Sequence, residues 1–333
     1  MSSSSCIGLD IGHSTVKVSF AGITGPSSFI FPSVVCPSFL ISDDAEARRA
    51  ASETVTVGSR SFFIGDTARI QGGTSVSTGL SEDWIDSPEH AALLLGAFAK
   101  LRELLVDVNS PDLVMGLPTH LFLRQKDRLK EIVRRHVKVN SIRVIPQPMG
   151  PYQAYMLAPN GLPAVSRLMT KESWGVIEVG YFSTDFMLIQ DGRWMERASG
   201  ACSGVRVAAE HLVRLLSERG ITIDLLEAED ALRNGFIRSF GQKMDVTAEV
   251  SKSSDLIVAE VVDTATRLME PYARKLDGVL VAGGGAPLVY PLLKARWPHA
   301  VMLDNPRFAV AEGMRRLGLA LSFVRNITKE PVA

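Results

Sequence analysis

Cysteine and histidine are both scarce in this chain of 333 residues, and neither shows the spacing of a metal site. The three cysteines, Cys6, Cys36 and Cys202, lie far apart and form no CxxC pair, and the six histidines show no HxxxH spacing. These patterns argue against a disulfide scaffold and against a zinc site. They favour a protein of a reducing compartment, which we expect to be cytoplasmic.

Long apolar runs and an excess of charge are missing as well. No run reaches the roughly 18–20 residues that span a bilayer, and the opening "MSSSS" lacks the charged region of a signal peptide. The 36 basic and 36 acidic side chains cancel. We therefore expect no membrane association and no direct binding to nucleic acid. The composition, 46% hydrophobic and 22% charged, is typical of a soluble globular protein.

Short strand-like runs alternate with helical segments along the chain, which predicts α/β layers. Ser87-Pro88-Glu89 has the capping residue, the early proline and the early acid of a helix start. In the first half we also predict strands over 112–117 and 141–146 and a basic helix over 124–137. In the second half we predict a hairpin over 174–189, a strand over 193–199, a turn at 200–204, a helix over 204–219, a helical region over 224–276, strands from 278 and 300, and a last helix over 309–324.

Each half of the chain begins with an acid-bearing hairpin, "CIGLDIGHSTVKVSF" (6–20) and "WGVIEVGYFSTDFMLI" (174–189), which suggests an internal duplication. In the first hairpin Asp10 stands two residues before Gly12, in a turn whose amides can form an anion-binding concavity. A carboxylate beside a polyphosphate needs a cation between them, which predicts hydrated Mg²⁺ at Asp10. Lys17 can supply a further positive charge. An ordinary turn with a solvated aspartate and lysine is the alternative.

A third element, "GVLVAGGGAPLVYPLL" (278–293), leads an apolar strand through three glycines into a helix. Such a turn lets backbone lie flat against a ligand at a helix N-terminus, where the dipole favours anions. The segment is neither a P-loop nor a GxGxxG motif. Tight packing between strand and helix would explain the glycines equally well.

Taken together, the three elements resemble the actin, Hsp70 and sugar-kinase superfamily, and nearly the whole chain takes part in the resemblance. Smaller segments are similar to bacterial and archaeal actins, and the length and the "GLP" motif favour the plasmid-segregation (ParM-type) and archaeal members. These segments are "FPSVV" (31–35), "FFIGDTA" (62–68), "MGLPTHLF" (115–122), "RVIPQPMGPYQAY" (143–155), "GACSGVRVAAEHLVRLL" (200–216) and "AVAEGM" (309–314).

The resemblance implies a duplicated, ribonuclease H-like α/β fold in which two domains flank a nucleotide cleft. Domain I would span residues 1–165, with a small outer subdomain over about 32–85, and would be completed by a C-terminal helix over 309–326. Domain II would span residues 172–308, with a helical outer part over about 220–276.

The resemblance also assigns site residues. Asp10 and Glu178 would hold Mg²⁺ through water, Gln147 would orient the attacking water, and Asp185 would help to position it. The nucleotide would contact Gly12, His13, Ser14, Thr15, Lys17, Gly180, Ser183 and Thr184 through its phosphates, Gly283, Gly284 and Gly285 through adenosine, and Arg206 and Glu210 through ribose or base.

Several of these residues also have simpler interpretations. Gln147 lies between two prolines and would suit an exposed turn, and His13 would suit a turn-stabilising ring. Arg206 and Glu210 would suit a plain helix surface. Glu178 and Tyr181 stand where the family usually has Asp and a second Gly, so we expect nucleotide binding with slow hydrolysis.

The function implied by the resemblance is that of an ATPase that binds ATP (or GTP) with Mg²⁺ and polymerises with itself. Its role would be plasmid or DNA segregation, with a DNA-bound adaptor protein as partner, or cytoskeletal work. A small-molecule kinase of the same superfamily and a nucleotide-binding scaffold with little turnover are the alternatives.

Overall fold

The computed structural model describes residues 5–23, 25–77, 79 and 81–329 of the chain. The chain divides into two compact units: unit 1 comprises Met1–Met169 and Phe308–Ala333, and unit 2 comprises Thr170–Arg307. Within the described ranges, no helix combines the length and the apolar character that crossing a bilayer requires. Residues 1–4 and 330–333, which include most of the opening "MSSSS", lie outside the described part of the chain.

The central sheet of unit 1 has five strands in the order β3-β2-β1-β7-β8. β1 (Cys6–Ile11), β2 (Thr15–Gly22) and β3 (Gly25–Pro32) are antiparallel neighbours joined by short turns. β7 (Asp112–Leu117) and β8 (Ser141–Pro146) add to β1 in parallel, which requires a crossover before each of them. The predicted first hairpin and the two predicted strands are confirmed.

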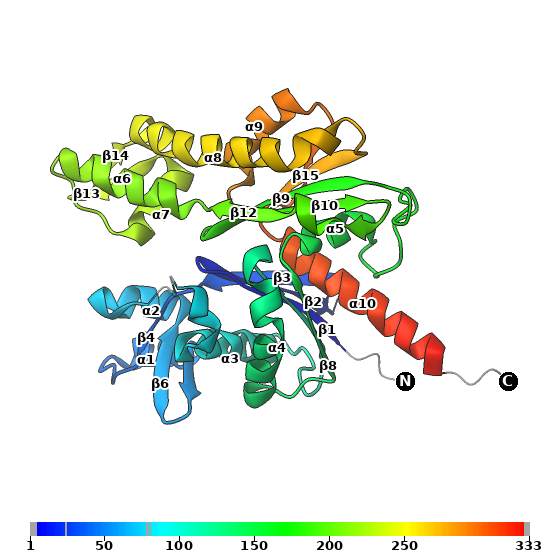
Figure 1. The fold of residues 1–333 in the computed structure, drawn as a ribbon. Helices are drawn as coiled ribbons and strands as arrows, with labels where there is room; N and C mark the ends of the chain where they lie inside the picture. The colour runs from blue at the N-terminus through cyan, green and yellow to red at the C-terminus, as the bar shows by residue number, and fades with distance from the viewer. Residues whose placement is uncertain (1–4, 24, 78, 80, 330–333) are drawn as a thin grey trace. The chain divides into compact units, whose positions relative to one another are not determined.

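Helices cover both faces of this sheet (Figure 1). Successive side chains of a strand point to opposite faces. Leu9 and Met115 accordingly belong to a core that includes residues of α3 (Pro88–Glu103) and α4 (Thr119–His136). Val114, one residue away from Met115, packs with Val310 and Met314 of α10 (Ala309–Lys329).

The predicted starts of the two covering helices have different outcomes. Ser87 caps α3 by accepting a hydrogen bond from the His90 amide, with Pro88 in the first turn, as predicted. α4 begins at Thr119 instead of residue 124. Leu121 of its first turn is buried, so packing extends the helix beyond the basic segment from which it was predicted.

Glycines bring α10 directly onto the backbone of its neighbours. A Cβ on Gly313 would overlap the carbonyl oxygen of Gly150 in α5 (Met149–Met156), and one on Gly8 would overlap that of Ala311. Because interiors are packed to crystal-like density, such overlaps can be relieved only by moving backbone. The C-terminal helix is therefore an integral part of unit 1.

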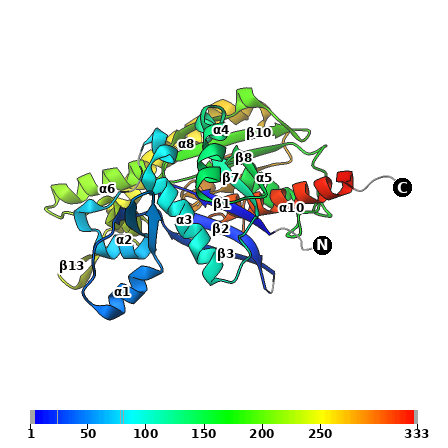
Figure 2. The ribbon, with the colours of Figure 1, turned by 90° about the horizontal axis from the view of Figure 1, so that it is seen from below.

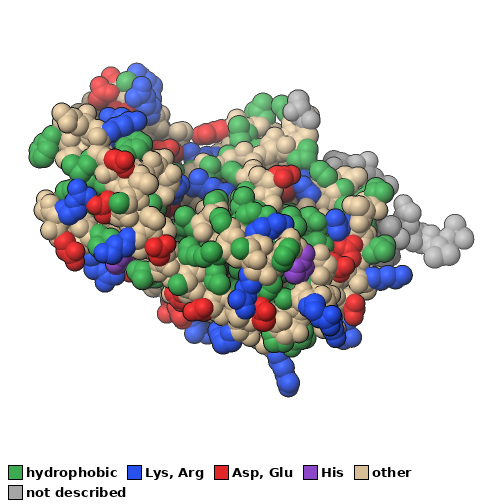
Figure 3. Space-filling view, turned by 90° about the horizontal axis from the view of Figure 1, so that it is seen from above, with side chains coloured by type: hydrophobic (Ala, Val, Ile, Leu, Met, Phe, Trp, Pro, Cys, Tyr) green, Lys and Arg blue, Asp and Glu red, His purple; other side chains and the backbone are tan. Residues whose placement is uncertain are grey.

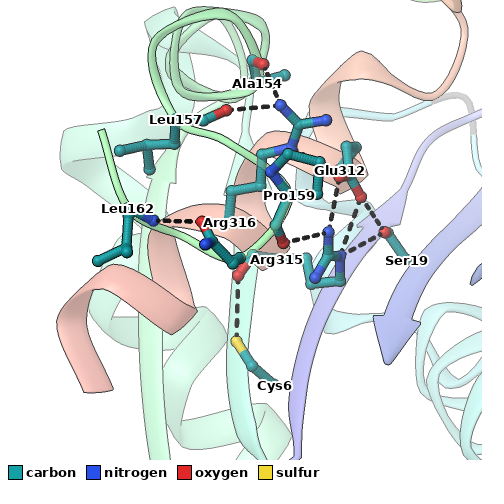
Figure 4. Close-up of polar contacts among 10 residues, drawn as sticks. Cys6, Ser19, Ala154, Leu157, Pro159, Leu162, Glu312, Arg315 and Arg316 are labelled. Atoms are coloured by element: carbon teal, nitrogen blue, oxygen red, sulfur yellow. Dashed lines mark hydrogen bonds and ion pairs between the residues drawn. The ribbon is translucent and has the colours of Figure 1, made fainter. Parts of the chain in front are cut away.

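A buried polar network holds the same helix in place (Figure 4). Arg315, one of the largest fully buried side chains, donates to both carboxylate oxygens of Glu312, at 3.0 Å and 2.7 Å. Ser19 of β2 donates to Glu312 at 2.5 Å, and Arg315 also reaches the Pro159 carbonyl at 3.0 Å. Arg316 bonds to carbonyl oxygens at the end of α5. Every polar partner is thus supplied within unit 1.

The outer part of unit 1 lies at the end of that unit remote from α10 (Figures 1 and 2). It contains a three-stranded sheet in the order β4-β6-β5, in which the neighbouring strands are antiparallel. Glu53 ties this part to α3, since it accepts from Lys100 Nζ at 2.7 Å and from the Thr67 amide at 2.7 Å. The elements are β4 (Val35–Pro37), α1 (Asp44–Ala51), β5 (Thr54–Val57), β6 (Arg60–Ile64), α2 (Gly65–Gln71) and the 3-10 turns Gly73–Ser75 and Glu82–Asp86.

The central sheet of unit 2 repeats the plan of unit 1. Its path is β11-β10-β9-β15-β16, with the antiparallel hairpin of β9 (Trp174–Val179) and β10 (Ser183–Gln190) as predicted. β15 (Gly278–Ala282) and β16 (Ala300–Met302) add in parallel, and α9 (Ala286–Arg296) joins them. Both units thus place a hairpin beside parallel strands, which confirms the predicted duplicated α/β fold.

Three local predictions for unit 2 are wrong, and two of them concern the strands beside β10. The predicted turn at 200–204 is mostly a strand, β12 (Gly200–Ser203), because its residues pair with β10. The predicted strand over 193–199 is only β11 (Arg193–Trp194), followed by a 3-10 turn.

The region 224–276, predicted as helical, contains a hairpin. α7 (Leu225–Asn234) ends at the left-handed Gly235, and β13 (Phe236–Ser239) and β14 (Gln242–Asp245) follow before α8 (Thr247–Ala273). With α6 (Arg206–Glu218) these elements enclose a separate small core. They lie at the end of unit 2 away from β15 and α9 (Figure 1).

Candidate functional site

The turn between β1 and β2 is fixed by backbone hydrogen bonds and by Ser33. The Gly12 amide donates to the Thr15 carbonyl at 3.2 Å, and the Ser33 amide donates to the Ser14 carbonyl at 2.8 Å. The Ser33 hydroxyl donates to the Gly12 carbonyl at 2.5 Å. Ser33 was not among the predicted site residues, since nothing near it in the sequence links it to this turn.

Asp10 is buried at the end of β1 and is held from two sides. Lys17 lies directly opposite it in the β1–β2 register and donates to Oδ2 at 2.9 Å. Gln147, which follows β8, donates to Oδ1 at 3.0 Å. A buried carboxylate is costly unless it is hydrogen-bonded, and charge-assisted bonds are the stronger kind. Asp10 therefore has one defined orientation, and Gln147 is a partner of Asp10 rather than an exposed turn residue.

His13 takes part in an aromatic stack that the sequence did not reveal. Its ring lies 4.6 Å from that of Trp84, and Trp84 meets the ring of His90 edge-on at 5.3 Å. Burial, together with the neighbouring His13, lowers the pKa of His90 to about 3, so His90 is neutral near pH 7. Trp84 stands as a lone aromatic residue in the acidic stretch "SEDWIDS", where no site residue was predicted.

The second hairpin brings its two acids face to face. Glu178 and Asp185 are direct partners in the β9–β10 register, and both are buried. Ser183 Oγ donates to Asp185 at 2.6 Å, and the Ser183 carbonyl accepts from the Gly180 amide at 3.0 Å. Thr184 Oγ1 donates to the Ser203 carbonyl at 2.9 Å. Like charges directly opposite each other in a sheet repel, so this pair suits a site that receives a cation.

Tyr181 occupies the tip of the second turn, and its backbone is tied to the start of α6. The amides of Val205 and Arg206 donate to the carbonyls of Gly180 and Tyr181 at 3.0 Å and 2.9 Å. Burial raises the pKa of the Tyr181 phenol, and the neighbouring Glu229 raises it further. The phenol is therefore neutral across the physiological range.

The residues predicted for ribose or base contacts lie on α6, and their charges act on the pKa of the Tyr181 phenol, which Arg206 lowers and Glu210 raises. Arg206 Nε donates to Glu210 Oε1 at 2.7 Å along α6. A second ion pair, Arg233 with Glu229 at 2.6 Å on α7, also acts on the pKa of this phenol. This second pair was not predicted, because its only sequence signal is an ordinary i,i+4 spacing.

The three glycines after β15 have different surroundings. Gly283 has φ +93, and a Cβ there would overlap the Val179 carbonyl oxygen and lie 2.7 Å from Glu178 Oε1. A Cβ on Gly285 would lie 2.5 Å from the Val205 side chain, whereas one on Gly284 would meet no atom within 4 Å. Gly283 and Gly285 thus serve close packing, and Gly284 alone leaves room for a ligand.

Alanine substitution should separate these glycines. We expect Gly283→Ala to lower the free energy of unfolding by about 2–4 kcal/mol, because it adds left-handed strain and an overlap with backbone. Gly284→Ala is the matched control and should change it by less than about 0.5 kcal/mol. Urea denaturation of the two variants measures the difference, and equal losses would contradict the packing shown here.

The predicted site residues thus form a group within each unit. Asp10, Lys17 and Gln147 are in contact in unit 1, and Glu178 lies opposite Asp185 and against Gly283 in unit 2. Among the residues that the structure describes, no three His, Cys, Asp or Glu side chains form a group that could hold a metal ion directly.

Comparison with known proteins extends this description. Residues 8–150 match the family model for the actin like proteins N terminal domain. The ParM of a 15-stranded filament from Clostridium botulinum has a TM-score of 0.73 at 20% sequence identity, covering 95% of this chain and 99% of that chain. No curated protein sequence matches the chain.

Two further structures show the same similarity. The archaeal actin homologue Ta0583, in complex with ADP, has a TM-score of 0.69 at 20% identity, covering 93% of this chain and 97% of that chain. The actin-like protein Alp7A has a TM-score of 0.72 at 16% identity, covering 97% and 98%. Residues 8–150 thus match an actin-like N-terminal domain, and the chain has the actin-like fold of ParM-type proteins and archaeal actin homologues.

Proposed function

We propose that this protein binds ATP with Mg²⁺, hydrolyses it slowly and assembles with its own copies into filaments. The observation that carries the proposal is Asp10, a buried carboxylate held by Lys17 and Gln147 beside the Gly12 turn. A carboxylate beside an amide-lined turn is the arrangement that a hydrated cation and a phosphate require. Two similar structures, a ParM filament and an archaeal actin homologue in complex with ADP, support it.

The phosphate-binding turns would be Gly12–Thr15 and Gly180–Thr184. Gly284, where the backbone has open space, would face the adenosine. Arg206 and Glu210, which both act on the pKa of Tyr181, would contact ribose or base.

The residues present fit Mg²⁺, because carboxylate oxygens are the ligands it prefers and it commonly keeps its waters. Asp10 and Glu178 would hold the ion through water, and when bound it would neutralise phosphate charge. Gln147 would act as a positioning residue that fixes Asp10, and Lys17 would offer its charge to the phosphates. Asp185, oriented by Ser183, would help to place the attacking water.

Slow hydrolysis follows from the second turn. Glu178 is one methylene longer than the aspartate usual in the family, and a displacement of about 1 Å can cost on the order of 10²-fold in rate. Glu178→Asp should therefore raise phosphate release at saturating ATP, by up to about 10²-fold. Glu178→Gln, which keeps the length but lacks the charge, is the control and should lower it. Unchanged turnover in Glu178→Asp would mean that the longer acid is already accommodated.

The decisive experiment for the proposal combines electron microscopy with a phosphate-release assay. The protein would be examined with ATP, GTP, ADP and no nucleotide at micromolar concentration. Filaments that form with ATP and weaken as phosphate is released are expected. A protein that neither binds nucleotide nor assembles would contradict the proposal, and transfer of phosphate to a sugar or acid would indicate a kinase instead.

A nucleotide-binding scaffold is the second candidate, and the position of Tyr181 favours it. This partly buried side chain stands in the second phosphate turn, where the family usually has glycine. Nucleotide-dependent filaments without measurable phosphate release would indicate the scaffold. In either case we propose plasmid or DNA segregation or cytoskeletal work as the role, with a DNA-bound adaptor protein as partner in segregation.

A further inference from the structure

The hairpin of β13 and β14 has an aromatic residue in its loop, at a position where an aromatic residue does not stabilise the hairpin. Its two-residue loop is Phe240-Gly241, and both residues have positive φ, +47 and +81. Such loops favour Asn-Gly, and a bulky residue in this conformation is an outlier. The Phe240 side chain is also fully exposed, at 105%. The hairpin alone therefore gains nothing from this phenylalanine.

The flanking residues make the same tip basic. Arg238 and Lys243 are direct partners in the hairpin register and are both exposed. Like charges in this position destabilise a strand pair. The one acid of the hairpin, Asp245, lies at its base and accepts from the Thr247 amide. We call Arg238, Phe240 and Lys243 the hairpin tip. Its chemistry suits a partner that offers an apolar contact next to negative charge.

The outer part of unit 1 offers that chemistry. Leu40 is 93% exposed and Phe39 is 53% exposed, with Phe39 meeting Phe63 edge-on at 5.3 Å. After Ile41 and Ser42 come the exposed Asp43, which caps α1, and Asp44, its first residue. We call residues 39–44 the acidic segment. The cations of α1, Arg48 and Arg49, come in its last turn, and Arg49 is paired with Glu46.

We propose that the hairpin tip of one copy of this protein docks on the acidic segment of a second copy. Phe240 would pack against Phe39 and Leu40, while Arg238 and Lys243 would face Asp43 and Asp44. An apolar centre with complementary charges around it is the usual anatomy of an interface. Because the two surfaces differ, the contact is heterologous and can repeat from copy to copy. The inference rests on the proposed filament and names one of its contacts.

The charge distribution of the protein requires that the attraction between the hairpin tip and the acidic segment act over short distances. The overall charge is zero, and on the face seen in Figure 3 acidic and basic side chains are interspersed without a large field of one sign. Attraction between exposed charges is screened beyond about 10 Å at 0.1 M salt. Only charges that approach each other closely, as at these two surfaces, would then guide docking.

Substitutions at the tip separate docking from folding. Phe240→Asn creates the favoured Asn-Gly loop, so it should leave the hairpin at least as stable. It should nevertheless raise the critical concentration for assembly with ATP at least about tenfold, as should Arg238→Glu with Lys243→Glu. Arg274→Glu with Lys275→Glu, also exposed in unit 2, is the matched control and should leave assembly unchanged. Normal assembly of the Phe240→Asn variant would overturn the proposal.

Charge exchange gives the complementary test. Asp43→Asn with Asp44→Lys keeps a capping residue at position 43 and should also block assembly. Arg238→Glu with Lys243→Glu chains mixed with these segment variants should recover part of the assembly that each lacks alone, because each tip then meets opposite charge on the unlike copy. A chain carrying all four charge changes should recover part of its assembly. Failure of both results would overturn the proposal.

Disulfide trapping tests the contact even if filaments do not form. Cys6 and Cys36 are buried and Cys202 is partly buried, so background reaction should be low. A mixture of Phe240→Cys and Leu40→Cys chains should yield a crosslinked dimer under oxidation, and a chain carrying both should yield a ladder. No dimer, or only a closed monomer from the double variant, would overturn the docking proposal. Nucleotide binding and phosphate release, measured on the same variants, report separately on the proposed function.

Discussion

Replacing Asp10 by asparagine is expected to lower the rate of phosphate release from ATP by about 10²-fold or more. The substitution keeps the shape of the side chain but removes the charge that would hold hydrated Mg²⁺. It also breaks the ion pair with Lys17, whose Nζ lies 2.9 Å from Asp10 Oδ2. Phosphate release after mixing with excess enzyme measures the effect on hydrolysis, and a fluorescent nucleotide measures binding separately.

Two further variants make this result interpretable. Gln147→Glu places a second carboxylate against Asp10 and should lower turnover by repulsion, whereas Gln147→Met removes only the hydrogen bond at 3.0 Å and should have a smaller effect. Wild-type turnover in Asp10→Asn, with the variant folded, would mean that the hydrolytic site lies elsewhere.

Replacing Arg315 by methionine is expected to lower the free energy of unfolding of unit 1 by about 3–5 kcal/mol. Arg315 is buried and donates to both oxygens of Glu312. Its removal leaves that largely buried carboxylate with only Ser19 and Arg316 as partners, and losing the buried cation costs more than the pair itself contributes. Urea denaturation, with hydrogen exchange of the α10 amides, would measure the loss.

The double variant Arg315→Met with Glu312→Met is the control for this prediction. It removes both charges of this pair and leaves Arg316 its carbonyl partners at the end of α5, so it should recover much of the lost stability. Equal losses in the single and double variants would show that packing, rather than the stranded charge, causes the effect.

The pH dependence gives an independent check of the same network. Burial by itself would raise the pKa of Glu312, but hydrogen bonds from Arg315, Ser19 and Arg316 hold it below its ordinary value of 4.5. The stabilisation is therefore fully present above pH 4.5 and is lost as the pH falls through the lower pKa of the folded protein. Arg315→Met should show less of this acid sensitivity, because only Ser19 and Arg316 then lower the pKa of Glu312.

The elements that could be predicted from the sequence are those with local signals. The β9–β10 hairpin follows from two apolar runs around a glycine turn, and the start of α3 follows from Ser87 and Pro88. The hairpin around Phe240-Gly241 was missed because its loop lacks the usual Asn-Gly signal. β12 was missed because "GACSG" has the composition of a turn, and only pairing with β10 makes it a strand.

The residues of the candidate site are likewise of two kinds, those with a local signal in the sequence and those that only the fold brings together. The acid of each hairpin and the three glycines are visible in a single sequence, because each lies within a few residues of the turn that it serves. Trp84 and Ser33 were not visible, because they reach the His13 and Gly12 turn from elsewhere in the chain. Gln147 was found through the family resemblance, but its bond to Asp10 is a long-range contact that no spacing predicts.

By itself, the sequence determined the duplicated α/β plan and the two acid-bearing hairpins, because apolar periodicity and glycine turns act over short distances along the chain. Only the tertiary structure decided which groups hold those acids. Folding brings Lys17 and Gln147 onto Asp10, sets Glu178 opposite Asp185, and leaves Gly284 as the open glycine of three. A buried carboxylate takes its environment from whatever packs around it, and that packing is set by the fold as a whole.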